Sequence, residues 1–375
     1  MDTLEAMKSI TNGKITNTGR QYNLDLLKVI AIVAMVICHS VTVLSSARPG
    51  YENELGYWMA ENFFGAYLAV AHAFMFCMGV GFVYSKSKDP KTLFKRGLRI
   101  YILAYILNFA RGTGYMLIAS LFDAEYLEMV SYTFFMQDIL HFAGLAMMIT
   151  ALFRKLKLDC HVILCISVVM SAVSQFVTWT DESNILVNAL IGTFVPTSMD
   201  VTSAFTLCGW YVFVAVGICF GEILQRTENL KRFYKRLLCF SSVILVVYIA
   251  ATVKNGCFFL SAEKNYYCAS LAEAAGLLSI DFVLLSLMYF AVDKLSPKAR
   301  EGMALQVCLK MSKNLNQIYI VHWCVIGLLN AVIIYLLALP VPYWVSYLLV
   351  VPILILSYRI ADVWTKRRDR KPARG

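Results

Sequence analysis

Long unbroken apolar blocks restrict what this chain can fold into more than any other feature. A helix that crosses a bilayer core of about 30 Å needs roughly 20 apolar residues, and such blocks recur from residue 24 to residue 363. Hydrophobic residues make up 59% of the 375 positions and charged residues only 15%, where a soluble domain has about 25% charged. The sequence therefore predicts an all-α polytopic membrane protein with the lipid bilayer as its surroundings.

About ten transmembrane helices are expected from these blocks. Residues 184–200 are short and interrupted by Gly and Pro, so they are predicted to form an outer-surface or re-entrant segment instead of a span. The predicted spans are residues 24–44, 57–84, 97–119, 133–153, 159–179, 203–224, 237–253, 268–291, 315–338 and 342–363.

The distribution of basic residues predicts the orientation. Lys and Arg gather in alternate loops, such as 86–99, 154–157 and 226–236. Because cytoplasmic loops carry an excess of Lys and Arg, both termini are expected in the cytoplasm, in a multi-pass protein of the cell membrane. Residues 1–23 would be a cytoplasmic segment, 24–363 one transmembrane domain and 364–375 a basic cytoplasmic tail. The same pattern accounts for the net charge of +10 without a nucleic-acid partner.

The eleven cysteines give no metal-like spacing, because no C-x-x-C occurs. Most lie in apolar segments, where a free Cys behaves as a small hydrophobic residue. No metal is therefore expected. Cys257 and Cys268 flank a predicted outer loop, and whether they pair is left open.

The first span carries three ionisable residues, although polar groups inside a membrane are costly and usually functional. Lys28 and His39 are 11 residues apart and return to nearly the same helix face, about 16 Å apart along the axis. Asp25 lies on the same side, three residues before Lys28. Two structural readings stay open: Lys28 could reach the inner headgroups, and His39 could bond a neighbouring carbonyl.

Arg96 and Arg99 open the third span and share a helix face. One reading is anchoring by positive charge at the inner surface. The other is a phosphate clamp, because the guanidinium fork can bond two phosphate oxygens at once. Lys95 and Lys28 would then add to the positive field.

Further ionisable residues lie deeper in the predicted spans. Asp138 and His141 are three residues apart in the fourth span, so the carboxylate could orient an imidazole, or the pair could form interhelical hydrogen bonds. Arg111, Asp281 and His322 are candidates for a substrate site or for structural pairing, and Asp281 could neutralise Arg111 or a lysine.

These residues resemble a known superfamily, the transmembrane acyltransferases. The resemblance covers the acyltransferase-3 family and the heparan-α-glucosaminide N-acetyltransferase-like family. A basic residue, ten others and then His is met by Lys28 and His39, and a later R-x-x-R by Arg96 and Arg99. The segments QIYIVHW and AFMFCMGVGFVYSK resemble the first family, and DILHFAGLAMM and CGWYVFVAVGICFGEIL resemble the second. The opening pattern is carried by Arg20, Asp25, Leu27, Lys28, Ile30, Ala31, Met35 and His39.

The resemblance implies transfer of an acyl group, usually acetyl, from cytoplasmic acetyl-CoA to a carbohydrate hydroxyl or amine, often on the far side. Lys28, Arg96 and Arg99 would contact the phosphates of coenzyme A. His39 would be the base, with His141 as the second candidate and Asp138 orienting whichever imidazole acts. A covalent acyl-histidine intermediate is the alternative.

This hypothesis depends on one cavity that joins the inner cations to His39. The rival hypothesis is a proton-coupled secondary transporter or flippase of a glycan or small polar substrate, because intramembrane Asp, His and Arg also form proton relays. Against it, the sequence has no repeat of the inverted-topology kind. The acceptor, the acyl group and the formation of a homo-oligomer are left open.

Overall fold

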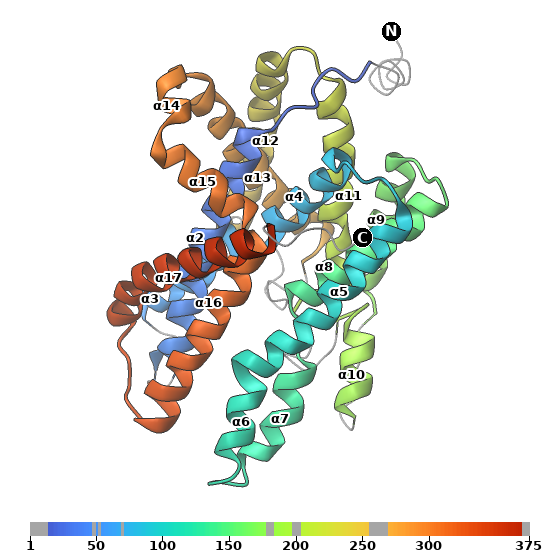
Figure 1. The fold of residues 1–375 in the computed structure, drawn as a ribbon. Coiled ribbons are helices and arrows are strands. Elements are labelled where there is room, and N and C mark those ends of the chain that lie inside the picture. Colours follow the sequence, from blue (N-terminus) through green and yellow to red (C-terminus); the bar gives the residue numbers. More distant parts are fainter. Residues whose placement is uncertain are drawn as a thin grey trace. The chain divides into compact units, whose positions relative to one another are not determined.

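The structure, a computed structural model of the chain, describes residues 14–46, 50–51, 54–68, 71–177, 184–196, 204–254 and 269–369. The regular elements of these ranges are helices (Figure 1). Their bounds are α2 Tyr22–Leu44, α3 Leu55–Trp58, η2 Met59–Tyr67, α4 Ala71–Tyr84, α5 Pro90–Asn108, η3 Phe109–Thr113, α6 Gly114–Ala119, α7 Tyr126–Phe135, α8 Ile139–Lys155, α9 Cys160–Ser174, α10 Ile185–Gly192, α11 Leu207–Arg226, α12 Leu230–Lys254, α13 Leu271–Asp293, α14 Pro297–Glu301, α15 Met303–Lys313, α16 Leu315–Asn330, η5 Ala331–Leu336 and α17 Tyr343–Asp369.

Eight helical segments of the described residues are long and apolar enough to cross a membrane. The predicted fold class, an all-α polytopic membrane protein, is therefore confirmed. These segments are Tyr22–Leu44, Leu55–Tyr84, Pro90–Ala119, Leu207–Arg226, Leu230–Lys254, Leu271–Asp293, Leu315–Ile333 and Tyr343–Asp369.

The predicted spans 133–153 and 159–179 correspond to shorter helices. Helix α8 has 17 residues and α9 has 15, fewer than the roughly 20 that a bilayer core requires. The count of ten spans and the cytoplasmic position of both termini stay predictions. Of the segment 184–200, the structure describes residues 184–196, and they contain the eight-residue helix α10, which is too short to cross a membrane.

The helices form two compact units. The first unit comprises residues 1–21, 71–105 and 135–290, and the second comprises residues 22–70, 106–134 and 291–375. Long helices α5 and α13 each contribute to both units, since the divisions fall after Tyr105 and Phe290. The boundaries proposed from the sequence, with one transmembrane domain from 24 to 363, stay a prediction.

In the first unit, α11 is the central helix and packs against α4, α8 and α9. Glycines allow the closest of these contacts. A Cβ atom on Gly79 of α4 would stand 2.1 Å from the carbonyl oxygen of Val214, and one on Gly217 of α11 would stand 2.2 Å from that of Phe76. Such small residues let two backbones approach in a membrane, where packing rather than water exclusion holds helices together.

In the second unit, α2 is enclosed by η2, α15, α16 and α17 (Figure 1). Polar contacts tie both ends of α2 to these neighbours. Near its start, the hydroxyl of Ser312 in α15 donates to Asp25 Oδ1 at 2.5 Å. Just beyond its end, the hydroxyls of Ser45 and Ser346 are 3.0 Å apart. The ionisable residues of the first predicted span therefore face a packed helical environment.

Candidate functional site

Two histidines from distant parts of the sequence meet in the second unit. Nδ1 of His39 in α2 lies 2.9 Å from Nε2 of His322 in α16. The two rings are stacked, with centroids 5.2 Å apart and planes 10° apart. His322 is fully buried, and its Nδ1 lies 3.1 Å from the backbone carbonyl oxygen of Ile318. The imidazole of His39 is thus linked to a second imidazole and then to the backbone.

This chain of hydrogen bonds fixes the tautomers when both rings are neutral. The carbonyl of Ile318 can only accept, so Nδ1 of His322 carries a proton and donates it. Nε2 of His322 then has the lone pair and accepts from Nδ1–H of His39. It follows that Nε2 of His39 bears the lone pair of that ring, which is the form that a general base requires.

An arginine and an indole complete the cluster around the histidines. The ring of Trp323 lies 4.2 Å from the His39 ring between centroids. The guanidinium carbon of Arg111 lies 4.5 Å from the centroid of the same indole, a cation–π distance. Arg111 also donates to Oδ1 of Asn108 at 2.9 Å and is buried. We call His39, His322, Trp323, Arg111 and Asn108 the two-histidine cluster.

Local backbone geometry brings Arg111 to this place. It lies in η3, a π-helical turn between α5 and α6, and such turns redirect side chains and are frequent at functional sites. Gly327 of α16 permits the approach, because a Cβ there would stand 2.4 Å from the carbonyl oxygen of Arg111. The backbones of η3 and α16 therefore touch, which places the guanidinium over the indole of Trp323.

Asp25 and Lys28, which the sequence placed on the same helix face as His39, also lie on α2. Nζ of Lys28 is 3.8 Å from Oδ1 of Asp25, and the Lys28 side chain is about a quarter exposed. Since Asp25 is held by Ser312, the carboxylate fixes one end of this pair. Lys28 and His39 share one continuous 23-residue helix, as the sequence predicted.

Arg96 and Arg99 lie on α5 in the first unit, and both are exposed. Lys28 and His39 belong to the second unit. The single cavity joining these cations to His39 stays a prediction.

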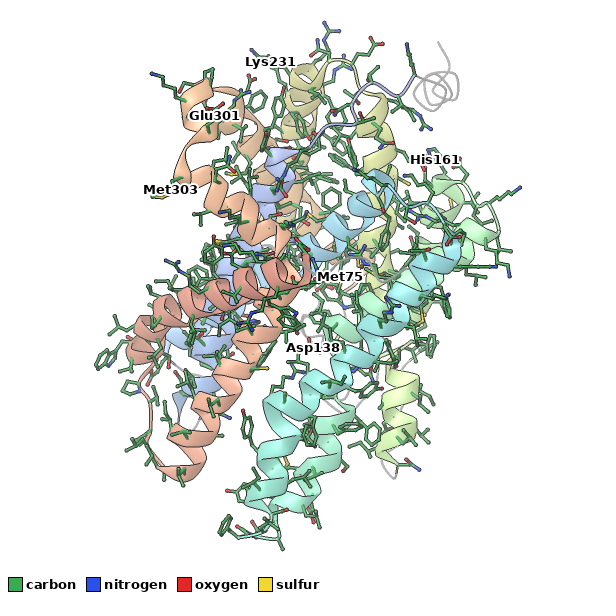
Figure 2. The ribbon with its side chains drawn as sticks, in the orientation of Figure 1. Met75, Asp138, His161, Lys231, Glu301 and Met303 are labelled. Atoms are coloured by element: carbon green, nitrogen blue, oxygen red, sulfur yellow. The ribbon has the colours of Figure 1, made fainter. Side chains whose placement is uncertain are left out.

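Asp138 and His141 form the beginning of α8, which Figure 2 shows with Asp138 labelled. The Asp138 carboxylate accepts from the backbone N–H of Ile139 at 2.6 Å, and Nδ1 of His141 accepts from the backbone N–H of Asp138 at 3.1 Å. The rings of Tyr101 and Tyr105 stand edge-on to this buried imidazole, with centroids 5.5 and 4.5 Å away. Asp138 and His141 together cap the N-terminus of α8.

Asp281 pairs with a histidine that the sequence did not link to it. Oδ2 of Asp281 in α13 lies 3.0 Å from Nδ1 of His72 in α4, and both side chains are fully buried. The ring of Phe213 lies 6.1 Å from that of His72. The pair therefore joins α4 to α13 through a buried polar contact.

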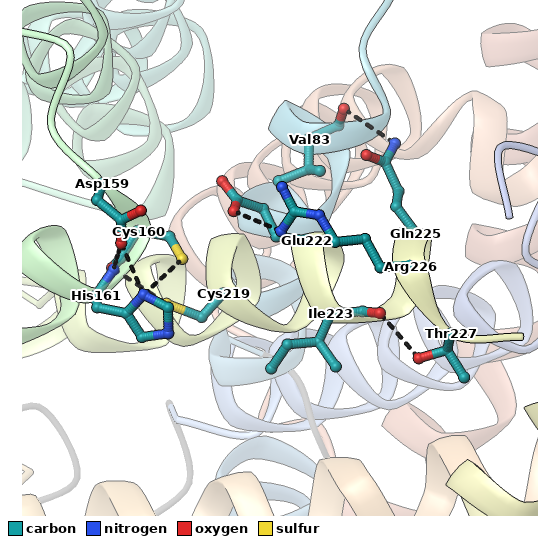
Figure 3. A network of polar contacts seen from close by, with 10 residues as sticks. All are labelled: Val83, Asp159, Cys160, His161, Cys219, Glu222, Ile223, Gln225, Arg226 and Thr227. Atoms are coloured by element: carbon teal, nitrogen blue, oxygen red, sulfur yellow. Dashed lines mark hydrogen bonds and ion pairs between the residues drawn. The ribbon is translucent and has the colours of Figure 1, made fainter. Parts of the chain in front are cut away.

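His161 lies in the first turn of α9 and contacts two neighbours in the chain (Figure 3). Its Nδ1 is 2.7 Å from Oδ1 of Asp159 and 3.6 Å from Sγ of Cys160. The three ligand-type atoms lie within 4.8 Å of one another. Asp159 also accepts from the backbone N–H of His161 and so caps α9. The expectation of no metal stays a prediction, and Cys257 and Cys268 lie outside the described residues.

Sequence reasoning named His39 and His322 separately but missed their contact. It offered Asp281 as a possible partner of Arg111, whereas Asp281 contacts His72 and Arg111 contacts Asn108 and Trp323. No local spacing links residue 39 to residue 322, because the contact depends on how α2 and α16 pack. The motif QIYIVHW, which contains both His322 and Trp323, was the signal available.

Comparisons with known proteins bear on this site. A search of curated proteins and a search of solved structures found no match. A family model described as heparan-alpha-glucosaminide N-acetyltransferase, catalytic, matches residues 20–251. The match includes Lys28, His39, Arg96, Arg99 and Arg111, and ends before His322. The resemblance to the acyltransferase-3 family stays a prediction that rests on the short motifs.

The family match spans more than half of the 375 residues and begins at the first motif, Arg20. The eight helices of transmembrane length agree with a membrane-embedded enzyme. The chain belongs to the family of heparan-alpha-glucosaminide N-acetyltransferase catalytic domains, which are transmembrane acetyltransferases.

Proposed function

We propose that the protein transfers an acetyl group from cytoplasmic acetyl-CoA to a carbohydrate hydroxyl or amine, with His39 as the general base. The observation that carries the proposal is the 2.9 Å contact between His39 and His322. It supplies an imidazole with the lone pair on Nε2, in a chain whose family performs acetyl transfer.

His39 is a better candidate for the base than His141. Nδ1 of His141 accepts a hydrogen bond from the backbone of Asp138 and contributes to the cap of α8. The His141 imidazole therefore has a structural role in the helix cap that is fulfilled without a bound substrate. His39 is only partly buried, and its partner His322 orients it through one ring nitrogen. We assign His322 the orienting role that the sequence suggested for Asp138.

The proposed reaction conserves all atoms. The acceptor oxygen or nitrogen attacks the thioester carbonyl while its proton passes to Nε2 of His39. The tetrahedral intermediate then breaks its carbon–sulfur bond, and the coenzyme A thiolate leaves and takes the proton from His39. Products are the acetylated acceptor and free coenzyme A. Acyl transfer through a covalent acyl-histidine is the alternative route, and it would use the same nitrogen.

Arg111 is the proposed donor to the oxyanion that forms on the thioester carbonyl. The ring of Trp323 contacts both the Arg111 guanidinium and the His39 ring. Arg111 also donates a hydrogen bond to Asn108, which fixes its position. A fixed cation in a site of low polarity stabilises developing negative charge strongly, because little reorganisation is needed.

Coenzyme A is a polyanion, and we propose that Arg96, Arg99 and Lys28 bind its phosphates. Arg96 and Arg99 are exposed and share one face of α5, so their guanidinium groups are accessible to a ligand. The Lys28 ammonium remains partly exposed beside Asp25. The pantetheine arm would extend along α2 from Lys28 to His39, about 16 Å.

Expression of the chain in cells that lack it tests this function. Mass spectrometry of cell-surface glycans should show a gain of one acetyl group with the wild-type chain and none with His39→Ala at equal protein level. His161→Ala is the matched control, since His161 is an exposed histidine remote in sequence from the cluster, and it should acetylate as the wild type does. Equal acetylation by His39→Ala would remove His39 from catalysis.

The transporter hypothesis retains one supporting observation, the fully buried pair of His72 and Asp281. Binding of labelled acetyl-CoA to the purified protein separates the two functions. Saturable binding followed by release of free coenzyme A supports the enzyme. Absence of binding, together with proton uptake coupled to substrate movement in vesicles, supports the transporter.

A further inference from the structure

Helices α5 and α8 run antiparallel and cross at two glycines. A Cβ on Gly97 would stand 2.6 Å from the carbonyl oxygen of Gly144, and a Cβ on Gly144 would stand 2.7 Å from the backbone nitrogen of Tyr101. The helices are thus in backbone contact at this crossing, as small residues permit in membranes. Residues before Gly97 on α5 and after Gly144 on α8 lie at the same end of the pair.

At that end the two helices enclose an open groove of about 570 Å³. We call it the lysine groove. Its floor is apolar, and three lysines contribute to its lining. The residues that line it are Pro90, Lys91, Phe94, Lys95, Leu145, Met148, Ile149, Ala151, Leu152 and Lys155.

The charges of the groove select an anionic occupant. Lys91 and Lys95 are four residues apart on one face of α5, and Lys155 is at the end of α8; all three are exposed. No carboxylate is among the described residues that line it. The nearby Asp89 is bonded to the hydroxyl and backbone N–H of Thr92 at 2.6 and 2.8 Å, bonds that hold its pKa below the usual value.

The exposed apolar residues of the groove floor indicate that its occupant comes from the lipid bilayer. Phe94 and Leu152 are 47% and 46% exposed, although both are large apolar residues of the helices that form the groove. Leu98 and Ile102, one and two turns beyond Phe94, are exposed on the same face of α5. In a segment long and apolar enough to span a membrane, such a face contacts lipid tails. The groove therefore opens towards the bilayer.

We propose that the lysine groove binds an anionic phospholipid of the surrounding membrane. Its phosphate would lie between the ammonium groups of Lys91, Lys95 and Lys155, and an acyl chain would lie along Phe94, Met148 and Ile149. Basic pockets between transmembrane helices at the membrane surface recognise anionic headgroups in this way. On the predicted orientation, this is the cytoplasmic leaflet. This proposal does not rest on the acetyl-transfer reaction.

The test measures lipid retention. Purified protein is reconstituted in vesicles of phosphatidylcholine with added phosphatidylglycerol, extracted, washed, and examined by native mass spectrometry. We expect one phosphatidylglycerol to stay bound to the wild type. The triple variant Lys91→Gln, Lys95→Gln, Lys155→Gln should bind it on the order of 100-fold more weakly.

Two further variants keep the test decisive. The control triple Lys231→Gln, Arg232→Gln, Lys235→Gln removes the same charge from the exposed start of α12 and should retain the lipid. Met148→Trp fills the floor without changing the charge, and should lose the lipid while its melting temperature reports whether it folds.

Three results would overturn the proposal. Equal loss in both triple variants would mean general attraction to net charge. Equal retention of phosphatidylcholine would mean no headgroup selection. Displacement of the bound lipid by acetyl-CoA, added alone, would assign the groove to the nucleotide instead.

Discussion

Nδ1 of His39 and Nε2 of His322 lie 2.9 Å apart and join α2 to α16 through one hydrogen bond. Because His322 also donates to the carbonyl of Ile318, the direction of both bonds is set from the backbone outwards. The reactive nitrogen of His39 is thereby specified by a residue 283 positions away. This relationship turns a histidine in a membrane helix into a candidate general base.

His322 should act as a positioning residue, and two substitutions separate this role from packing. His322→Phe keeps a flat ring but has no acceptor for His39 Nδ1–H, so kcat should fall, by less than the roughly 10² to 10⁴-fold expected for loss of a general base. His322→Gln offers an amide oxygen as acceptor and should recover part of the rate. Steady-state kinetics in membranes at matched protein level measure both. Equal rates in the two variants would assign His322 to packing alone.

The arginines of α5 should contribute to donor binding and not to the chemical step. Arg96→Gln with Arg99→Gln removes two charges and two guanidinium forks, so acetyl-CoA should bind about tenfold to 100-fold more weakly. Titration of the purified protein with labelled acetyl-CoA measures this. The control pair Arg232→Gln with Arg236→Gln removes the same charge from exposed positions on α12. An unchanged dissociation constant in the α5 variant would leave these arginines as membrane anchors.

The crossing of α4 and α11 should be intolerant of a single methyl group. Gly79→Ala places a Cβ 2.1 Å from the carbonyl oxygen of Val214 and should destabilise the fold by about 1–3 kcal/mol, through forced backbone movement. Gly81 is two residues further along the same helix, and a Cβ there has nothing within 4 Å. Gly81→Ala should therefore unfold like the wild type in detergent. Equal unfolding temperatures for the two variants would contradict the observed crossing.

The buried pair of His72 and Asp281 should show strong coupling in a double-mutant cycle. Removing either partner takes this buried polar contact from the other, and breaking such a pair typically costs about 3–5 kcal/mol. His72→Leu and Asp281→Leu should each destabilise the protein, and the double variant should be less destabilised than the sum of the two. Unfolding of all four proteins in the same detergent supplies the cycle. If the changes in unfolding free energy are additive, the contact between the two side chains makes no contribution to stability.

The fold class was predictable because membrane burial acts on each segment separately. The block that begins at Leu24 has enough apolar residues to span a bilayer, whatever its neighbours are, and the structure forms α2 there. Helix ends were less well predicted. The third span starts at Pro90 instead of residue 97, because Pro fits the first turn and Asp89 caps it.

Most of the candidate site was predictable only as separate residues. Lys28 and His39 were placed on one helix because their spacing obeys the helical period. The contacts of His39 with His322, of Arg111 with Trp323 and of Asp281 with His72 could not be predicted in the same way, since each joins helices that are distant in sequence. The π-helical turn that carries Arg111 adds a second reason, because its shift in register does not follow from an apolar pattern.

A single-turnover experiment tests most directly whether His39 is the group that removes the acceptor proton. Purified protein is loaded with labelled acetyl-CoA, mixed with total surface glycan as acceptor, and the label on the glycan is followed over time. His39→Ala should bind acetyl-CoA as tightly as the wild type and transfer at least about 100-fold less label. Transfer at the wild-type rate by a His39→Ala protein with intact donor binding would contradict the account.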